Sequence, residues 1–220
     1  MKSVILLSGG LDSLVSFGLC KDSIELALTF DYGQKSLEKE ISASKRICEY
    51  YGKTHKIIKL DFLKEITNTS LVSDKEIPSD AEMNEESAKA VWVPNRNSLF
   101  LNVAASFCDS YGYEEIIIGA NKEEAQTFPD NTKEFIERIN KTFEYSTQVH
   151  PLVVAPLINF DKNDIVKKAL DENIPLKLVQ SCYNSGNKHC GKCESCKRLK
   201  RALLSNKCYN VIKEIFEDEN

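Results

Sequence analysis

The chain has 220 residues, of which 42% are hydrophobic and 28% are charged, and its formal net charge is −4. This composition is typical of a globular protein with a sizeable core. The excess of acidic residues argues against tight non-specific binding of nucleic acid, so we expect no stable nucleic-acid partner. No apolar run reaches the length of a membrane span, and we expect a cytoplasmic protein. In that compartment, the eight cysteines indicate metal binding or catalysis rather than disulfides.

Short apolar runs alternate with helical patterns in the first part of the chain. Alternating strands and helices are typical of a parallel sheet covered by helices. Gly52 follows the second helical pattern and is a typical helix terminator. The expected elements are strands at 4–7, 24–32 and 54–62 and helices at 11–20 and 36–51.

The pattern continues after a long polar connection at residues 64–91, which is typical of an active-site lid or an insertion. Asp161 and Asp164 have the spacing of a capping box at a helix N-terminus. A final amphipathic helix is expected after the cysteine-rich segment. We expect a parallel α/β domain at residues 1–175 and a helical zinc-binding region at 176–220. The further expected elements are helices at 97–111, 131–145 and 161–173 and strands at 115–119 and 152–158.

Four cysteines near the C-terminus have the spacing of a metal site. Their pattern is Cys-x7-Cys-x2-Cys-x2-Cys, and four thiolates form the tetrahedral shell that Zn²⁺ accepts. Six lysines and arginines in "KHCGKCESCKRLKR" offset the negative charge of such a site. An iron–sulfur cluster is the alternative, but the ferredoxin continuation x3-Cys-Pro is missing. We therefore predict a structural zinc held by Cys182, Cys190, Cys193 and Cys196.

The segment Ser8–Ser13, "SGGLDS", lies between the first expected strand and the first expected helix. Unpaired N–H groups at a helix N-terminus attract phosphate, and glycines let the anion come close to the backbone. Asp12 would repel phosphate, so we interpret it as a helix cap or as a ligand of Mg²⁺. Taken alone, the segment is also compatible with an ordinary turn.

The pattern Ser-Gly-Gly-x-Asp-Ser resembles the pyrophosphate-binding loop of the PP-loop ATP pyrophosphatase superfamily. The resemblance implies a Rossmann-like, HUP-type domain that cleaves ATP to AMP and pyrophosphate and transfers AMP to a substrate oxygen. The ATP-binding residues that it implies are Leu7, Ser8, Gly9, Gly10, Leu11, Asp12, Ser13 and Leu14, with Tyr32 and Gln34 beside the adenosine.

Further segments resemble one family of that superfamily, the 7-cyano-7-deazaguanine synthases (QueC) of queuosine and archaeosine biosynthesis. The resemblance implies that ATP and ammonia convert 7-carboxy-7-deazaguanine into its nitrile, through adenylated intermediates and an amide. It also implies Mg²⁺, zinc and a homodimer. The segments are "FDYGQKSLEKE" at 30–40, "VPNRNSLFLNVAA" at 93–105, "IIIGANKEEAQTFPDNTKEF" at 116–135, "APLINFDKNDIV" at 155–166 and the four cysteines.

Candidate catalytic and substrate-binding residues come from the matching segments. The planar fork of Arg96 suits a carboxylate or phosphate, Asp130 can accept from the N–H edge of a guanine-like ring, and Phe128 can stack on it. Each also has a simpler interpretation: a surface salt bridge for Arg96, a helix cap for Asp130 and core packing for Phe128. The candidates are Asp12 and Arg96 for catalysis and Arg96, Asn97, Asn121, Phe128 and Asp130 for the substrate.

Two of these neighbourhoods have further interpretations. Asn97 is also a candidate helix cap. Lys122, Glu123 and Glu124 are expected to be solvated, although one of the carboxylates is a candidate metal ligand. No nucleophilic triad is evident, so we expect catalysis by positioning and electrostatics.

Three alternative functions stay open. The bacterial family pattern has Arg-His where this chain has Lys35-Ser36, and Cys-Arg where it has Asn131-Thr132. These differences allow an enzyme that adenylates the same acid for another amine, such as a protein terminus. A tRNA-modifying PP-loop enzyme is another alternative, although it favours a basic surface. A nucleotide-sensing protein without catalysis is the third.

Overall fold

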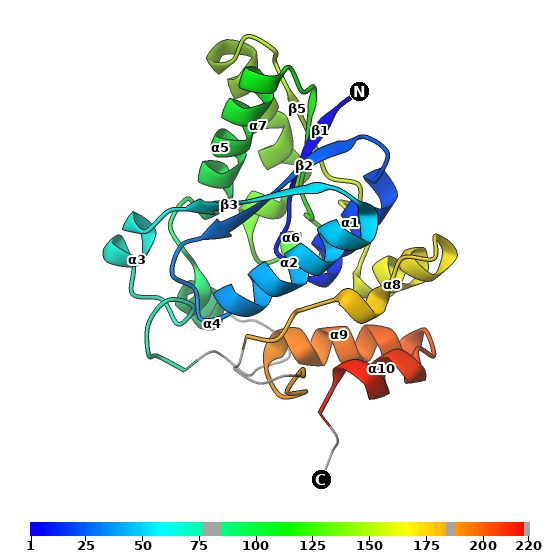
Figure 1. Cartoon of the computed structure of the whole chain (residues 1–220). Coiled ribbons are helices and arrows are strands. Elements are labelled where there is room, and N and C mark those ends of the chain that lie inside the picture. Colours follow the sequence, from blue (N-terminus) through cyan, green and yellow to red (C-terminus); the bar gives the residue numbers. More distant parts are fainter. Residues whose placement is uncertain (77–84, 184–187, 218–220) are drawn as a thin grey trace.

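The computed structural model describes residues 1–76, 85–183 and 188–217. Its centre is a parallel sheet of five strands in the order β3-β2-β1-β4-β5 (Figure 1). The order reverses between β1 and β4, so a crevice opens at the carboxyl ends of these two strands. The strands are β1 (Ser3–Leu6), β2 (Ile24–Asp31), β3 (Thr54–Lys59), β4 (Glu115–Ile117) and β5 (Leu152–Val154).

Helices cover both faces of the sheet, because successive side chains of a strand point to opposite faces. Ile5 and Leu7 belong to one buried core, while Val4 and Leu6 belong to the other. The helices of the first core are α1 (Leu11–Cys20), α2 (Leu37–Tyr51) and α8 (Lys162–Asp171), and those of the second are α5 (Arg96–Tyr111) and α7 (Lys133–Ser146).

The C-terminal region packs against the first of these cores. Leu199, Leu203 and Phe216 are buried in the same cluster as Leu14 and Val166. In Figure 1 the last two helices, coloured orange and red, lie beneath α2 and α8. The division of the chain into an α/β domain at 1–175 and a zinc-binding region at 176–220 stays a prediction. This region contains η2 (Leu176–Leu178), α9 (Glu194–Ser205) and α10 (Tyr209–Ile215).

Most of the predicted elements are present, and two local signals are confirmed to the residue. The first helix spans the expected residues 11–20. Asp161 caps α8 by accepting from the backbone N–H groups of Asn163 and Asp164, and the side chain of Asp164 accepts from the N–H of Asp161. Local hydrogen bonds decide both signals, so the sequence was sufficient to predict them.

Other elements differ from expectation. The last strand ends at Val154 rather than at 158, because Ala155 is followed by a proline that has no N–H to donate. The expected connection at 64–91 contains helical turns, although residues 77–84 lie outside the described residues. Among the described residues, no helix is long and apolar enough to cross a membrane. The short helices that were not expected are α3 (Phe62–Ile66), α4 (Glu85–Val91), α6 (Lys122–Ala125) and η1 (Pro129–Asn131).

Candidate functional site

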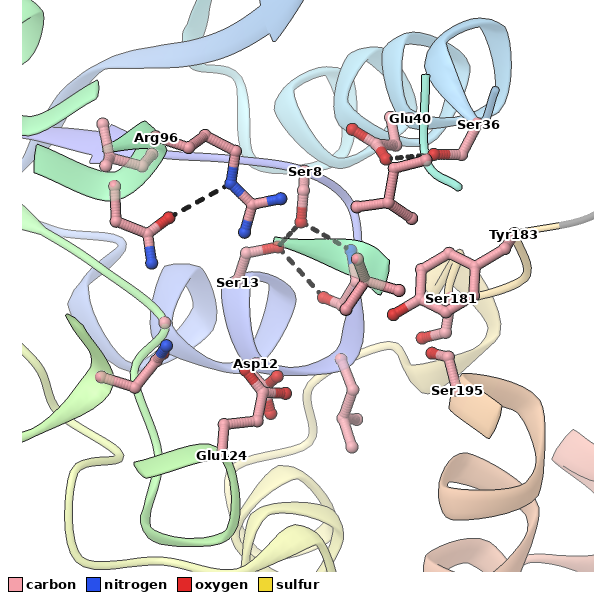
Figure 2. A pocket seen from close by; sticks show the side chains of 18 of the residues that line it. Ser8, Asp12, Ser13, Ser36, Glu40, Arg96, Glu124, Ser181, Tyr183 and Ser195 are labelled. Atoms are coloured by element: carbon pink, nitrogen blue, oxygen red, sulfur yellow. Dashed lines mark hydrogen bonds between the residues drawn. The ribbon is translucent and has the colours of Figure 1, made fainter. Parts of the chain in front are cut away.

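A cleft of about 330 Å³ opens at the carboxyl ends of β1, β2 and β4. Figure 2 shows Ser8 and Ser13 at its floor, Arg96 on one wall and Tyr183 and Ser195 on the opposite wall. The cleft therefore combines the loop after β1 with segments from most of the chain, including the C-terminal region.

The loop between β1 and α1 can adopt its shape only with glycine at position 9. Gly9 has φ +78°, and a Cβ there would lie 2.6 Å from the Cβ of Ala43 in α2. Gly10 is the N-cap of α1 and has no side-chain cap, so the first N–H groups of the helix have no partner within the helix. The hydroxyls of Ser8 and Ser13 lie 3.3 Å apart beside them. The loop thus presents backbone and hydroxyl donors to the cleft.

The end of β4 packs directly against this helix start. A Cβ on Gly119 would lie 3.0 Å from the backbone nitrogen of Ser13 and 3.1 Å from the Cβ of Asp12. A side chain there would require the start of α1 to shift by a few tenths of an ångström, so glycine favours this close approach. Gly119 lines the cleft and belongs to the segment quoted at 116–135, although no binding role was predicted for it.

Asp12 is part of a buried charge cluster. Lys162 Nζ lies 2.6 Å from Oδ2 of Asp12 and 2.7 Å from Oε1 of Glu124, and only 9% of the Lys162 side chain is exposed. The interpretation of Asp12 as a helix cap is therefore wrong, because its side chain points to Lys162 rather than to the helix backbone. Glu124 is not solvated as expected, since the cation of α8 holds it.

The charges of this cluster perturb one another. Burial raises the pKa of Asp12 to about 6, although the charge of Lys162 opposes the shift. Burial acts to lower the pKa of Lys162, but the two carboxylates outweigh it and the pKa is raised. Burial acts to raise the pKa of Glu124, but the charge and hydrogen bond of Lys162, together with Asn121 and Arg198, outweigh it and the pKa is lowered. Lys162 is therefore a cation throughout the physiological range.

A second charge network adjoins the first. Glu123 lies 2.7 Å from Nη2 of Arg201 and 3.7 Å from Nε of Arg198. Arg198 also pairs with Glu194 in its own helix, α9. The expectation that Glu123 is solvated is wrong, because only 19% of its side chain is exposed. The short helix α6 thus connects α8 to α9.

Arg96 lies at the N-terminus of α5 and points into the cleft (Figure 2). Its Nη1 donates to the hydroxyl of Tyr32 at 3.2 Å, and its guanidinium carbon lies 5.7 Å from the centre of that ring. The interpretation of Arg96 as part of a surface salt bridge is wrong, because among the described residues its guanidinium group donates to Tyr32 inside the cleft. Asn97 is not the helix cap, because that position belongs to Asn95, which has φ +55°.

Gln34 supports the cleft from behind. Its Oε1 accepts from the N–H of Tyr32, and its Nε2 donates to the carbonyl of Phe30 and to Glu40. Only 4% of Gln34 is exposed, and the residue does not line the cleft. Gln34 therefore holds the turn that presents Tyr32 to the cleft. It does not itself face the cleft, where the predicted contact with adenosine would require it.

The turn η1 brings Phe128 and Asp130 to the cleft. Thr132, not Asp130, caps α7, because its hydroxyl accepts from the N–H of Phe135. Burial raises the pKa of Asp130, and the charge of Arg96 opposes the shift. Asp130 is therefore an acceptor inside the cleft rather than a helix cap.

The four predicted metal ligands come together. The sulfur atoms of Cys182, Cys190, Cys193 and Cys196 all lie within 4.8 Å of one another. The Sγ atoms of Cys190 and Cys196 are 3.9 Å apart, and a tetrahedral zinc with Zn–S bonds of about 2.3 Å requires about 3.8 Å. The cluster therefore fits a zinc ion in both donor type and spacing.

His189 lies beside this cluster and has a different role. Its Nε2 accepts from the N–H of Ser181 at 3.0 Å, so the proton lies on Nδ1, which donates to the carbonyl of Ile215 at 3.1 Å. The neutral ring thus connects the cleft wall to α10.

Comparison with known proteins adds independent evidence. A family model described as "Queuosine biosynthesis protein QueC" matches residues 2–207. The chain belongs to the QueC family. It is 49% identical to the 7-cyano-7-deazaguanine synthase of Methanosarcina mazei, over 92% of this chain and 94% of the relative. It is 47% identical to the enzyme of that name from Carboxydothermus hydrogenoformans, over 93% of this chain and 99% of the relative.

A solved structure, the NMN synthetase of Francisella tularensis, matches with 15% identity and a TM-score of 0.47, covering all 100% of this chain and 89% of that one. The family assignment does not depend on it.

In this QueC-family protein, most of the residues predicted to bind ATP or the acid substrate share one cleft. Four of them lie behind the cleft wall: Gly9, Leu14, Gln34 and Asn121. Asn121 is fully buried and caps α6 by accepting from the N–H of Glu124. Those that line the cleft are Leu7, Ser8, Gly10, Leu11, Asp12, Ser13, Tyr32, Arg96, Asn97, Phe128 and Asp130.

Several residues of the QueC-family cleft were not predicted. Lys162 carried one usable signal, since it follows the capping residue Asp161 at the sheet edge that also holds Asp12. Most of the others lie within or beside the segments quoted for the family resemblance and the cysteine cluster, but no role in this cleft was predicted for their own side chains. They include Glu40, Trp92, Gly119, Glu124, Tyr183, Glu194 and Arg198.

Proposed function

We propose that this chain is a 7-cyano-7-deazaguanine synthase, which uses ATP and ammonia to convert 7-carboxy-7-deazaguanine into the nitrile. One observation carries the proposal. The uncapped N-terminus of α1 and the guanidinium group of Arg96 open into the same cleft, so a triphosphate and a carboxylate can meet there. The synthase names of the relatives support this assignment.

The loop after β1 is the proposed site for the phosphates of ATP. The N–H groups at the start of α1 and the hydroxyls of Ser8 and Ser13 donate to phosphate oxygens, and the helix dipole favours the negative charge. Gly9 is required behind the loop, because any side chain there would contact α2. This arrangement orients the α-phosphorus toward the centre of the cleft.

Lys162 provides the fixed positive charge. Among the described residues, two of its three donors bind Asp12 and Glu124, and the third is available to a phosphate oxygen. Oδ1 of Asp12 is buried and has no hydrogen-bond partner among the described residues. A carboxylate oxygen beside phosphates fits Mg²⁺, which would offset the charge of the triphosphate.

The acid needs activation because oxide is a poor leaving group. A carboxylate oxygen attacks the α-phosphorus of ATP, and pyrophosphate leaves. Ammonia then attacks the carbonyl carbon of the acyl adenylate, AMP leaves and the primary amide forms. A second ATP adenylates the amide oxygen, and loss of AMP with the amide protons gives the nitrile. Arg96 orients the carboxylate through its planar fork, and Asp130 accepts from the N–H edge of the ring.

Zinc supports this cleft rather than the chemistry. Four thiolates leave no open coordination position, which is typical of a structural site. Cys182 belongs to the segment that lines the cleft, and Cys193 is the N-cap of α9. When bound, zinc holds that segment and α9 in register.

Product analysis tests the proposal. Purified protein is incubated with 7-carboxy-7-deazaguanine, ATP, Mg²⁺ and ammonium, and the products are identified by mass spectrometry. We expect the nitrile, with two AMP and two pyrophosphate per product. Formation of the amide alone would favour an enzyme with another amine acceptor. Intact ATP, or cleavage to ADP, would overturn the proposal. The homodimeric state and the cytoplasmic location stay predictions, and light scattering of the purified protein tests the former.

A further inference from the structure

The cleft contains two separate groups of aromatic side chains. The first consists of Phe30, Tyr32 and Phe100, near the end of β2. The second consists of Trp92 and Phe128, which come from the segment after α4 and from the turn before η1. The proposed reaction also brings two flat heterocycles into the cleft, the adenine of ATP and the deazaguanine ring of the acid.

The two groups differ in how closely their rings pack. The rings of Phe30 and Phe100 have centroids 4.0 Å apart and planes within 6° of parallel, so they cover one another. The rings of Trp92 and Phe128 are also nearly parallel, at 19°, but their centroids lie 6.2 Å apart. The rings of the second pair are therefore too far apart to cover one another face to face, although they share nearly one orientation.

Trp92 is held in place although its side chain is open to the cleft. It has a relative exposure of 36%, while the neighbouring Val93 is buried in the core with only 4% exposed. A large aromatic face that is anchored by a buried neighbour and left open in a cleft is typical of a surface that stacks on a flat ligand. Simple core packing would cover this face.

Hydrogen-bond chemistry distinguishes the two heterocycles at this wall. Asp130 follows Phe128 by two residues and lines the same cleft. A carboxylate only accepts hydrogen bonds. The guanine-type edge offers two adjacent donors, the ring N–H and the exocyclic amine, whereas the corresponding edge of adenine offers one donor and one acceptor. The acceptor beside the second aromatic pair thus matches the deazaguanine ring.

We propose that Trp92 and Phe128 together form the stacking surface for the deazaguanine ring. Trp92 is then a specificity-determining residue for the acid substrate. This inference rests on the proposed function and adds a residue that the sequence did not indicate. The adenine of ATP then lies toward Phe30 and Tyr32, at the end of β2.

Intrinsic fluorescence tests this assignment without turnover, because Trp92 is the single tryptophan of the chain. The wild-type protein is titrated separately with 7-carboxy-7-deazaguanine and with α,β-methylene-ATP, each with Mg²⁺, and corrected against free tryptophan amide. We expect saturable quenching by the acid alone and little change with the nucleotide analogue alone. Quenching only by the nucleotide analogue would assign this wall to adenine and overturn the inference.

Variants separate stacking from a structural effect. Loss of base stacking to an alanine typically weakens binding about 10-fold or more, so we expect Trp92→Ala to raise KM for the acid by about that factor and to leave KM for ATP unchanged. Trp92→Phe keeps an aromatic face and should recover most of the affinity. Phe128→Leu keeps the fluorophore, and its quenching should saturate at higher acid concentration.

A matched control uses another exposed aromatic residue. Tyr145→Ala removes a ring that is 91% exposed and does not line the cleft, so it should leave both KM values unchanged. If wild-type protein forms the nitrile but Trp92→Ala retains the wild-type KM for the acid, only the inference fails. If wild-type protein forms no adenylated product from the acid, the proposed function fails, whatever the fluorescence shows.

Discussion

Replacement of Lys162 by methionine tests whether the charge cluster beneath the cleft holds the fold together. Methionine keeps the length and apolar stem of the side chain but removes its charge. Two carboxylates, of Asp12 and Glu124, then face one another without their cation. Removal of one partner from a buried ion pair typically costs about 3–5 kcal/mol. We expect a cost near the lower end of this range, about 3 kcal/mol, because 30% of the Glu124 side chain is exposed to solvent.

A loss of about 3 kcal/mol lowers the melting temperature of a chain of this size by roughly 6–12 °C. Thermal unfolding followed by circular dichroism at about pH 8 measures this difference. Lys168→Met is the matched control in the same helix, because Lys168 also pairs with a glutamate at 2.7 Å, but both side chains are solvent-exposed. Its melting temperature should stay close to that of the wild type.

The pH dependence has a definite sign. Burial already raises the pKa of Asp12 to about 6 in the presence of Lys162. Without the cation this pKa rises further, and the pKa of Glu124, which Lys162 lowers, rises as well. A carboxyl with a raised pKa in the folded state stabilises the fold as the pH falls through that value. The deficit of Lys162→Met should therefore be greatest near pH 8 and shrink toward about pH 6. An equal deficit at both pH values, or no deficit, would refute the electrostatic account.

Three further predictions follow from the geometry of the site. Gly9→Ala should lower the free energy of unfolding much more than Gly52→Ala does. Both substitutions introduce left-handed backbone strain of about 1 kcal/mol, but the new Cβ at position 52 has no atom within 4 Å. Denaturant unfolding compares the two variants, and equal losses would contradict the close approach of Gly9 to α2. Elemental analysis should find about one zinc per chain, and Cys196→Ser should lose the metal and lower the melting temperature; visible iron–sulfur absorption in fresh protein would contradict this. Arg96→Lys keeps the charge but loses the fork, so KM for the acid should rise about 10-fold with a smaller change for ATP, and steady-state kinetics measures both.

Local patterns were sufficient to predict the elements whose ends depend on neighbouring residues. The helix at 11–20 and the capping box at Asp161 belong to this class, because their hydrogen bonds join residues a few positions apart. The position of the cleft also followed from sequence, since a strand followed directly by a glycine-rich helix start places donors at one edge of a parallel sheet. The clustering of the four cysteines could be predicted because two short spacings hold Cys190, Cys193 and Cys196 close together at the start of α9.

Contacts between distant segments could not be predicted in the same way. Asp12 and Lys162 are 150 residues apart, and although both were expected at the same sheet edge, no local pattern predicts that they pair. The pair Glu123-Glu124 has the local pattern of a solvated surface, because the cations that bind it come from α8 and α9. Trp92 follows a polar connection whose length and composition contain no information about where its end lies.

The two adjacent glutamates of α6 face different partners, because successive residues of a helix are separated by about 100°. Glu124 holds Lys162 beneath the loop after β1, and Glu123 holds two arginines of α9, the helix whose N-cap is Cys193. The loop after β1 and the start of α9 are therefore linked through two adjacent residues of α6, in addition to the hydrogen bond from the Gln180 N–H to the Gly9 carbonyl. An insertion of one residue between Glu123 and Glu124 would turn the two carboxylates by about 100° relative to one another, so it should not allow both sets of ion pairs to form together.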